Sequence, residues 1–377
     1  MRQSISPHPN NCKSGNSRIL IIGSEENRQM ILENAWYVAA WSHEVTTHPL
    51  ARRLFNLPVV LYRSLAGQAC ALIDSCAHRG APLSLGTVVA DGIRCNYHGV
   101  VFGGDGICTR IPNQDLIPDK ARVTSFPLVE KDDIVWLWHG DPAKADPTLI
   151  VDYPYHRDPA WPARFSMAPV AGNFMLIADN LLDATHLAYV HGSTVGGSDP
   201  NVHMVAESSL KPAKNGLRFE RLMRGAPPPP AYSACVPDLP KQIDRWQEFD
   251  FVVPSTVLQY SGGVPAGSDR AIAPAPRFDM RIFHSATPAT DTSCYYFWSL
   301  QNGHAIDDPR ATDVIFEQIE QAIAEDKVFI EAQQLRVDEL GEERLFDNAA
   351  DAARMMARRA IRKYAKMSSA SASLEPA

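Results

Sequence analysis

Two short segments of the chain, residues 76–80 (CAHRG) and 95–99 (CNYHG), each combine one cysteine with one histidine. The pattern Cys-x-His followed by Cys-x2-His supplies two thiolates and two imidazoles. Such a set can close a tetrahedral zinc site or hold a two-iron cluster. Either site requires the two segments to meet in space.

The order of these ligands favours the cluster. In a Rieske [2Fe–2S] centre two cysteines bind one iron and two histidines bind the other, so that each loop gives one ligand to each iron. Gly80, Pro82 and Gly99 flank the ligands, as expected where the backbone turns tightly beside bridging sulfides. We therefore predict a Rieske cluster, with structural zinc as the alternative; the predicted ligands are Cys76, His78, Cys95 and His98.

The residues around these segments have the pattern of short strands. Between about residues 55 and 138, apolar runs such as LPVVLYR and DIVWLWHGDP end in Gly, Asp or Pro, which are turn-forming residues. This pattern predicts a small antiparallel β domain over residues 30–145 that holds both Cys/His pairs.

The chain has 377 residues, and a single hydrophobic core seldom grows past about 250 to 300 residues, so two domains are expected. A second domain over residues 146–365 follows a Pro- and Asp-rich passage. It mixes a helix near residues 176–191, strand-like runs and a long helical stretch after Asp308-Pro309, which predicts an α+β fold. Residues 1–29 are polar, and are either a disordered extension or lie upstream of a true start at Met30; residues 366–377 are expected to be a disordered tail.

The segment DNLLDATHLAYVHG, residues 179–192, contains a second group of metal-binding residue types. On a helix Asp183 and His186 share a face, whereas His191 falls away from it unless the helix ends or distorts, and Gly192 follows where such an end is expected. Two histidines and one carboxylate form the ligand set of non-haem Fe(II) oxygenases. Taken alone, two histidines at this spacing are more often surface or satisfied residues than metal ligands, and spacing does not identify a third ligand.

Charge and composition narrow the possible partners. The net charge is −7 without any run of Lys or Arg, so neither nucleic acid nor membrane is an expected partner. Five of the seven cysteines are scattered singly, and no stretch approaches the roughly 20 apolar residues of a membrane span, which indicates a protein of the reducing cytoplasm. No G-x-G-x-x-G segment follows a strand, so electrons from NAD(P)H must arrive through a separate reductase.

Taken together, these motifs resemble the terminal oxygenase component of Rieske non-haem iron oxygenases, in the branch that contains vanillate and dicamba O-demethylases. The resemblance runs from about Asn34 to residue 365. It is carried by NAWYVAA, CAHRGAPLSLG, CNYHG, WLWHGDP, DNLLDATHLAYVHG and AEDK. It implies an α+β protein with an N-terminal antiparallel β Rieske domain and a C-terminal helix-grip-like α+β catalytic domain.

The resemblance also implies roles for individual residues. His186 and His191 would bind the mononuclear Fe(II) together with Asp326 of AEDK, with Glu325 as the fallback ligand. Asp183 would bridge His98 of one subunit to His186 of the next in a head-to-tail homotrimer, or else act as a carboxylate behind the ligands within one subunit. Asn180 would support the iron site, and His284 would either bind substrate or be a satisfied strand histidine.

The reaction implied is an O₂-dependent monooxygenation of a small substituted aromatic acid. O-demethylation would proceed through an unstable hemiacetal that releases formaldehyde, with electrons delivered by a reductase or ferredoxin component. A ring-hydroxylating dioxygenase is the alternative within the family. From another class, a Rieske electron carrier or a zinc-binding scaffold is the alternative.

Overall fold

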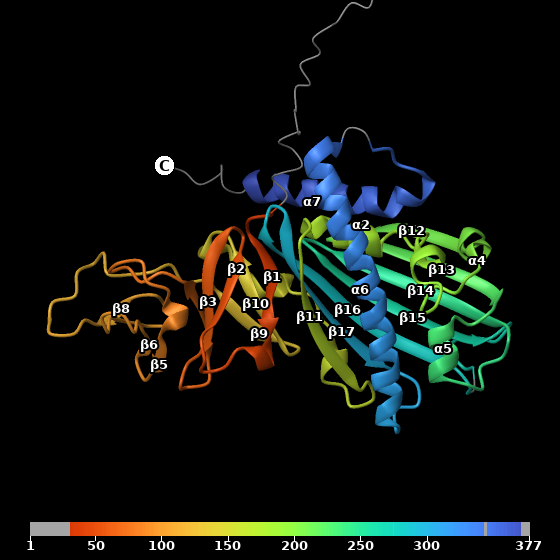
Figure 1. Cartoon of the computed structure of the whole chain (residues 1–377), viewed down its shortest axis with the longest axis horizontal. Helices are drawn as coiled ribbons and strands as arrows, with labels where there is room; N and C mark the ends of the chain where they lie inside the picture. The colour runs from red at the N-terminus through yellow and green to blue at the C-terminus, as the bar shows by residue number, and fades with distance from the viewer. Residues whose placement is uncertain (1–30, 274, 343–344, 371–377) are drawn as a thin grey trace, which may run out of the picture.

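The computed structural model describes residues 31–273, 275–342 and 345–370 (Figure 1). The predicted extension at residues 1–29 and the last seven residues of the predicted tail lie outside these ranges. Figure 1 shows an elongated chain, with small β-sheets at one end and a large sheet with its helices at the other. The last helix continues to Ala370, five residues past the expected end of the second domain.

The N-terminal part is built from three small antiparallel sheets, in agreement with the predicted β domain. Their strand orders are β1-β10-β9, β2-β3-β4 and β5-β6-β7-β8. The strands are β1 (Ala35–Trp41), β2 (Leu50–Leu54), β3 (Leu57–Arg63), β4 (Ala69–Ile73), β5 (Thr87–Val89), β6 (Gly92–Arg94), β7 (Val101–Phe102), β8 (Cys108–Arg110), β9 (Leu128–Lys131) and β10 (Ile134–His139).

Strand β1 (AWYVAAW) is buried along its whole length, because it lies between the small sheets and the large one. A strand covered on both faces must be apolar at every position, which accounts for the unbroken run that the sequence shows. Trp41 contacts Phe283 and Phe297 of the large sheet with ring centroids 6.1 and 5.7 Å apart. Thr287 of that sheet donates a 2.6 Å hydrogen bond to the carbonyl of Val38. The two parts of the chain therefore share a packed core.

The C-terminal part contains an antiparallel sheet of seven strands among the described residues, in the order β11-β17-β16-β15-β14-β13-β12. Long strands with few breaks in register make a broad, curved surface against which helices pack. The strands are β11 (Ala163–Val170), β12 (Glu207–Ala213), β13 (Gly216–Ala226), β14 (Ile243–Val252), β15 (Thr256–Pro265), β16 (Phe278–Thr290) and β17 (Ser293–Asn302).

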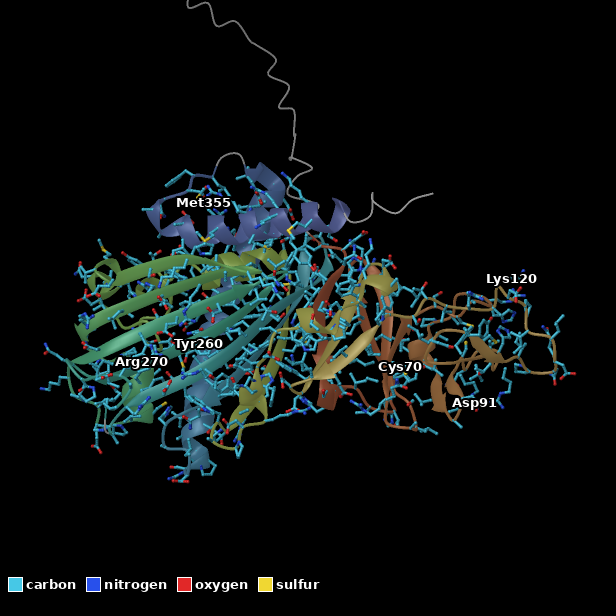
Figure 2. The ribbon with its side chains drawn as sticks, turned by 180° about the vertical axis from the view of Figure 1, so that it is seen from behind. Cys70, Asp91, Lys120, Tyr260, Arg270 and Met355 are labelled. Carbon is cyan, nitrogen blue, oxygen red and sulfur yellow. The ribbon has the colours of Figure 1, made fainter. Side chains whose placement is uncertain are left out.

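The long helix predicted after Asp308-Pro309 is α6, which lies across one face of this sheet (Figure 1). The Asp308 side chain accepts the backbone N–H of Arg310, Pro309 occupies the first turn, and Gly341 at φ +82° ends the helix. Figure 2 shows the other long helix, α7, which carries Met355, lying along one edge of the sheet. The helices are α2 (Phe174–Leu181), α3 (Leu187–Val190), α4 (Pro200–Met204), α5 (Pro230–Cys235), α6 (Pro309–Leu340) and α7 (Ala352–Ala370).

The α+β fold class is therefore confirmed, with an antiparallel β domain before a sheet that packs on a long helix. The single helix predicted over residues 176–191 is instead two helices, since α2 ends at Leu181 and α3 begins at Leu187. Within the described ranges, every helix is too short or too polar to cross a membrane.

Candidate active site

The two Cys/His segments form a matched pair of loops beside the small sheet β5-β6-β7-β8. In the first loop the N–H of Cys76 donates to the carbonyl of Ala81, and the N–H of Gly80 donates back to the carbonyl of Cys76, both at 2.8 Å. In the second loop Cys95 bonds Val100 and Gly99 bonds Cys95 in the same way and at the same distances. The two segments thus fold alike, as expected of loops that contribute equally to one cluster.

The cysteines of these loops face inward and the histidines outward. Cys76 and Cys95 are 3% and 2% exposed, whereas His78 and His98 lie on the surface. The two imidazole rings are neighbours, with centroids 4.6 Å apart. This division by burial suits a two-iron cluster in which one iron takes both thiolates and the other, nearer to solvent, takes both imidazoles.

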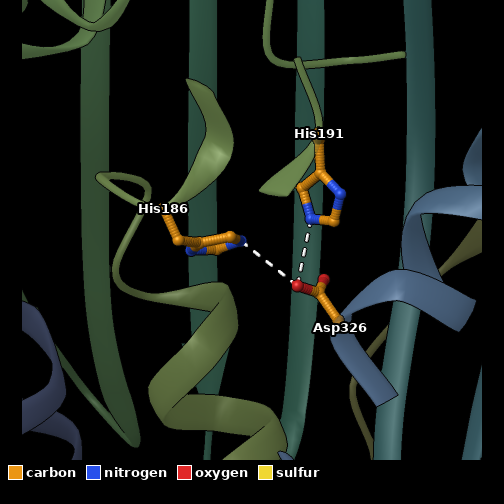
Figure 3. Close-up of side chains that lie close together, drawn as sticks. All are labelled: His186, His191 and Asp326. Carbon is orange, nitrogen blue, oxygen red and sulfur yellow. Dashed lines mark hydrogen bonds and ion pairs between the residues drawn. The ribbon is translucent and has the colours of Figure 1, made fainter. Parts of the chain in front are cut away.

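The second group assembles from helices that are far apart in the sequence (Figure 3). Among the described residues, His186, His191 and Asp326 form a cluster whose ligand atoms all lie within 4.8 Å of one another. Asp326 Oδ1 lies 3.4 Å from His186 Nε2 and 3.0 Å from His191 Nε2. Ligand atoms bound about 2.1 Å from one ion at adjacent positions are about 3 Å apart, so these three residues fit a single metal ion.

The break in the predicted helix makes this arrangement possible. The turn between α2 and α3 carries His186, and the end of α3 carries His191, so both rings face Asp326 on α6. On an unbroken helix the two histidines would diverge, as the sequence indicated. The α3 helix ends at His191, just before Gly192.

Each histidine is oriented through its other ring nitrogen. His186 Nδ1 lies 2.6 Å from the carbonyl of Asp183, and His191 Nδ1 lies 2.7 Å from Glu325 Oε2. Both of these oxygens only accept hydrogen bonds, so each Nδ1 carries the proton and each Nε2 is free to bind metal. Glu325, the fallback ligand, therefore lies behind His191 and not beside Asp326.

The carboxylates of Asp326 and Glu325 favour the positively charged form of the His191 imidazole. Burial alone would lower the pKa of His191, but the hydrogen bonds and charges of Asp326 and Glu325 outweigh it and raise that pKa. The site is thus built to stabilise a cation between these residues.

Asn180 and Asp183 both lie at this site. Asn180 Nδ2 donates a 3.0 Å hydrogen bond to Asp326 Oδ1, which holds that carboxylate toward the histidines. The Asp183 carboxylate accepts the N–H and hydroxyl of Thr185 at 2.9 and 2.6 Å, so within one chain it contacts neither imidazole. Only its backbone carbonyl reaches His186.

The three candidate metal ligands open into a cavity between the sheet and α6. Its walls are largely apolar, with contributions from Phe249, Met280 and Ile282, which is the usual character of a small-molecule site. His284 also lines it, buried at 3% exposure. Its Nδ1 lies 2.7 Å from Tyr296 Oη and its Nε2 lies 3.0 Å from Gln259 Oε1.

Sequence reasoning missed the polar residues that strand β14 contributes to this cavity. Arg245 and Gln247 line it together with Phe249. A signal was present, because alternate positions of β14 (Ile243, Phe249, Phe251) belong to the core, and two polar residues interrupt that apolar face.

Comparisons with known proteins match both halves of the chain. Residues 35–127 match the Rieske [2Fe–2S] domain, and residues 170–367 match the vanillate O-demethylase oxygenase C-terminal domain. The chain belongs to the vanillate O-demethylase branch of the Rieske oxygenases.

Among curated relatives of this Rieske oxygenase is the toluene-4-sulfonate monooxygenase system iron–sulfur subunit TsaM1 of Comamonas testosteroni. It is 35% identical, over 86% of this chain and 94% of the relative. The dicamba O-demethylase oxygenase component of Stenotrophomonas maltophilia is 33% identical, over 81% and 88%. The crystal structure of dicamba monooxygenase bound to dicamba superposes with a TM-score of 0.81 at 33% identity, over 90% of this chain and 98% of that one.

As a Rieske oxygenase, the protein is an enzyme whose cofactors are a [2Fe–2S] cluster and a mononuclear non-haem iron. The described residues fit both groups, since the paired loops offer two buried thiols and two outer imidazoles, and the His/His/Asp cluster offers one face of three donors. The structural zinc alternative is wrong, because the matched domain is a [2Fe–2S] domain. The electron-carrier alternative is also wrong, since the second half matches an oxygenase domain.

Proposed function

We propose that this Rieske oxygenase removes a methyl group from a methoxy-bearing aromatic acid, releasing formaldehyde and leaving a phenol. The observation that carries the proposal is that His186, His191 and Asp326 open directly into a cavity whose walls are largely apolar, as suits the face of an aromatic ring. Relatives named as vanillate and dicamba O-demethylases support the choice of reaction.

Within this proposal each site residue has one task. Cys76, His78, Cys95 and His98 hold the cluster, and His186, His191 and Asp326 hold the iron. The iron, when bound, supplies the activation of O₂. Asn180 keeps Asp326 in place by its 3.0 Å hydrogen bond, and His284 in the cavity wall would donate from Nε2 to the substrate in place of its present partner Gln259.

A second candidate is oxidation of a methyl carbon on an arenesulfonate. It is favoured by the 35% identity to the toluene-4-sulfonate monooxygenase subunit, which spans nearly all of both chains. Its product would be a benzylic alcohol, with no formaldehyde released.

We infer that the enzyme works as a homotrimer in which Asp183 joins two subunits. Figure 1 shows the β5–β8 sheet, which carries the cluster loops, at the opposite end of the chain from the large catalytic sheet. His98 is exposed and Asp183 is partly exposed, so a second copy could place the two residues in contact. The Asp183 carbonyl accepts from His186 within the chain, and the Asp183 carboxylate would accept an imidazole N–H from His98 of the next subunit, so one residue would orient both rings and shorten the electron path.

A separate reductase or ferredoxin, using NAD(P)H in the cytoplasm, would supply the electrons. Curated relatives are named as oxygenase components of larger systems, which supports such a partner.

The test is product analysis with a surrogate reductase and a panel of methoxybenzoates, with and without O₂. We expect formaldehyde and a phenol in equal amounts, and only when O₂ is present. A benzylic alcohol from toluene-4-sulfonate without turnover of methoxybenzoates would favour the second candidate. A cis-diol, or turnover under anaerobic conditions, would contradict the proposal.

A further inference from the structure

A buried guanidinium forms part of the cavity wall. Arg245 is 1% exposed, and it donates to the carbonyls of Val195 at 2.7 Å and Gly196 at 3.3 Å. Its Nε has no hydrogen-bond partner, and among the described residues no carboxylate lies within 4.0 Å of it. Buried charges are normally paired, whereas this cation has no counter-charge in direct contact among the residues that the structure describes.

A second buried arginine lies behind the same wall. Arg221 is 5% exposed and donates to Gln247 Oε1 at 2.9 Å and to the carbonyl of His203 at 2.8 Å. Burial, and then the charge of Arg245, lower the pKa of Arg221 to about 10, so it is still cationic at neutral pH. It too has no carboxylate within 4.0 Å among the residues that the structure describes. Two buried cations without a carboxylate in direct contact therefore lie at one side of the cavity, and the charge of Asp183 offsets that of Arg221 only in part.

The hydrogen bond from Arg221 also fixes the orientation of Gln247. A guanidinium can only donate, so it must bind the amide oxygen of Gln247. The amide nitrogen of Gln247 is left over, and within the described ranges it donates to no other residue, while the side chain lines the cavity. Arg245 and Gln247 lie two positions apart on β14, so they share one face of the strand.

His284, in contrast, brings no charge to the cavity. Burial lowers its pKa to about 3, so the ring is neutral. Gln259 Oε1 can only accept, so the ring's Nε2–H donates to it, and Nδ1 of the neutral ring accepts from the Tyr296 phenol, which burial keeps protonated by raising its pKa. Gln259 in turn donates to Ser261 at 2.9 Å, which leaves this chain of partners internally satisfied.

We propose that Arg245 and Gln247 form the subsite that receives the anionic group of the substrate, a carboxylate or a sulfonate. This inference rests on the proposed function and adds the residues that select the substrate class. Donors without acceptors, beside two unpaired cations, are complementary to a group that only accepts hydrogen bonds and carries negative charge. The anion would lie against β14, with the rest of the ring in the apolar part of the cavity next to the His/His/Asp cluster.

The test measures binding, not turnover, with the holoenzyme, without reductase and under anaerobic conditions. The probes are 4-methoxybenzoate, toluene-4-sulfonate and the neutral 4-methoxybenzamide, titrated by calorimetry. The wild-type enzyme should bind at least one anion about tenfold or more tightly than the amide, as expected for a charge-assisted hydrogen bond. The stronger of the two anions identifies whether carboxylate or sulfonate is the natural group.

Gln247→Glu is the decisive variant, because it keeps the acceptor for Arg221 and the side-chain length but replaces the free donor with a negative charge. It should weaken binding of both anions about 100-fold or more and change amide binding by less than about threefold. Arg245→Met should also reduce the preference for anions, and Arg245→Lys should restore part of it. Arg224→Met, which removes an exposed arginine of β13 paired with Glu207, is the matched control and should change nothing.

Iron content and the visible spectrum of the cluster establish that each variant is folded and loaded. Since Arg245 also holds the carbonyls of Val195 and Gly196, a folding failure of its variants leaves Gln247→Glu as the deciding result. Equal binding of acid and amide by the wild-type enzyme would overturn the inference, as would a variant that weakens both equally. Neither result bears on the proposed O₂-dependent reaction, which the product assay tests separately.

Discussion

At the scale of single residues, the iron site depends on hydrogen bonds behind the ligands. Glu325 and Asp326 are adjacent on α6, yet they act on opposite sides of His191, one at Nδ1 and the other at Nε2. Such partners fix the ring and make it a stronger ligand, and their loss weakens metal binding about 10- to 100-fold.

We expect Asp326→Asn to lower the iron content from about three to about two atoms per chain, because the cluster loops are untouched. Glu325→Gln should keep the iron but weaken its binding about 10- to 100-fold. Metal analysis after dialysis against a chelator, with the cluster absorbance as reference, measures both. The control is Glu320→Gln, an exposed residue of the same helix. If Glu325→Gln and Glu320→Gln retain iron equally, Glu325 does not support His191.

The sequence indicated the cluster ligands more directly than it indicated the residues of the iron site and the cavity. The cluster ligands lie in two local segments with recognisable spacing, so the pattern alone indicated them. Asp326 is 135 residues from His191 in sequence, and only the resemblance to a family pointed to it. Arg245 and Gln247 were missed because the alternation in β14 shows that they share the core-facing side but does not show that a cavity opens there, which depends on how the neighbouring strands and α6 pack.

At the scale of elements, the two cluster loops have the same backbone conformation although their sequences differ. Each loop has the same pair of backbone hydrogen bonds and a glycine with positive φ, Gly80 at +73° and Gly99 at +79°. They differ in their surroundings. A Cβ on Gly99 would lie 2.8 Å from Pro112 Cγ, whereas a Cβ on Gly80 would meet only Ser75 Oγ at 3.8 Å.

We expect Gly99→Ala to lose more cluster than Gly80→Ala. Both changes place an L-residue in left-handed backbone at about 1–2 kcal/mol, but only the first adds a clash with a proline ring. The measurement is cluster content per chain after purification and its rate of loss on warming. Gly67→Ala, at φ +86° with open space around it, reports the backbone cost alone. Equal cluster loss in the two loop variants would show that the Pro112 contact is unimportant.

The start of α6 could be predicted from the sequence, whereas the break between α2 and α3 could not. Local signals at Asp308, Pro309 and Gly341 define where α6 begins and ends, so its start could be predicted. Asp183 gives a local signal for the break after Leu181, because its carboxylate accepts the N–H of Thr185 in place of a helical partner, but Asp and Thr also occur inside helices. The partners of His186 and His191 on α6 accompany that break, and these are tertiary contacts that spacing does not report.

At the scale of the whole molecule, His156 ties the two domains together. Its Nδ1–H donates to the carbonyl of Asp132 at 2.5 Å, and its Nε2 lies 2.6 Å from the Ser299 hydroxyl on the large sheet. Burial lowers the pKa of His156, against the opposing influence of Asp132 and Asp133 nearby, so the folded protein holds it neutral.

Acid should therefore loosen the domain interface. A histidine with a lowered folded pKa contributes fully above its unfolded value of 6.5, and that contribution falls as the pH drops below 6.5, by at most about 1.4 kcal/mol per pH unit. The unfolding temperature, followed by tryptophan fluorescence near Trp41, should drop between pH 7.5 and 5.5. His156→Gln should be less stable at pH 7.5 but should show a smaller drop. A variant that keeps the full pH dependence would remove His156 as a cause.

The proposed role of Asp183 requires that two subunits of the enzyme contact each other. Asp183→Asn keeps the oxygen that accepts from Thr185, so both metal centres should remain filled. Losing the negative charge that would accept from His98 of the neighbouring subunit should slow substrate-triggered oxidation of the reduced cluster about 10- to 100-fold, measured by stopped-flow absorbance. Asp199→Asn, which alters a helix cap in the same region, is the control and should leave that rate unchanged.

Because the proposed bridge requires a neighbouring subunit, the wild-type enzyme should sediment as a trimer. A fully coupled monomer, or an Asp183→Asn enzyme with a normal rate, would mean that electrons travel within one chain.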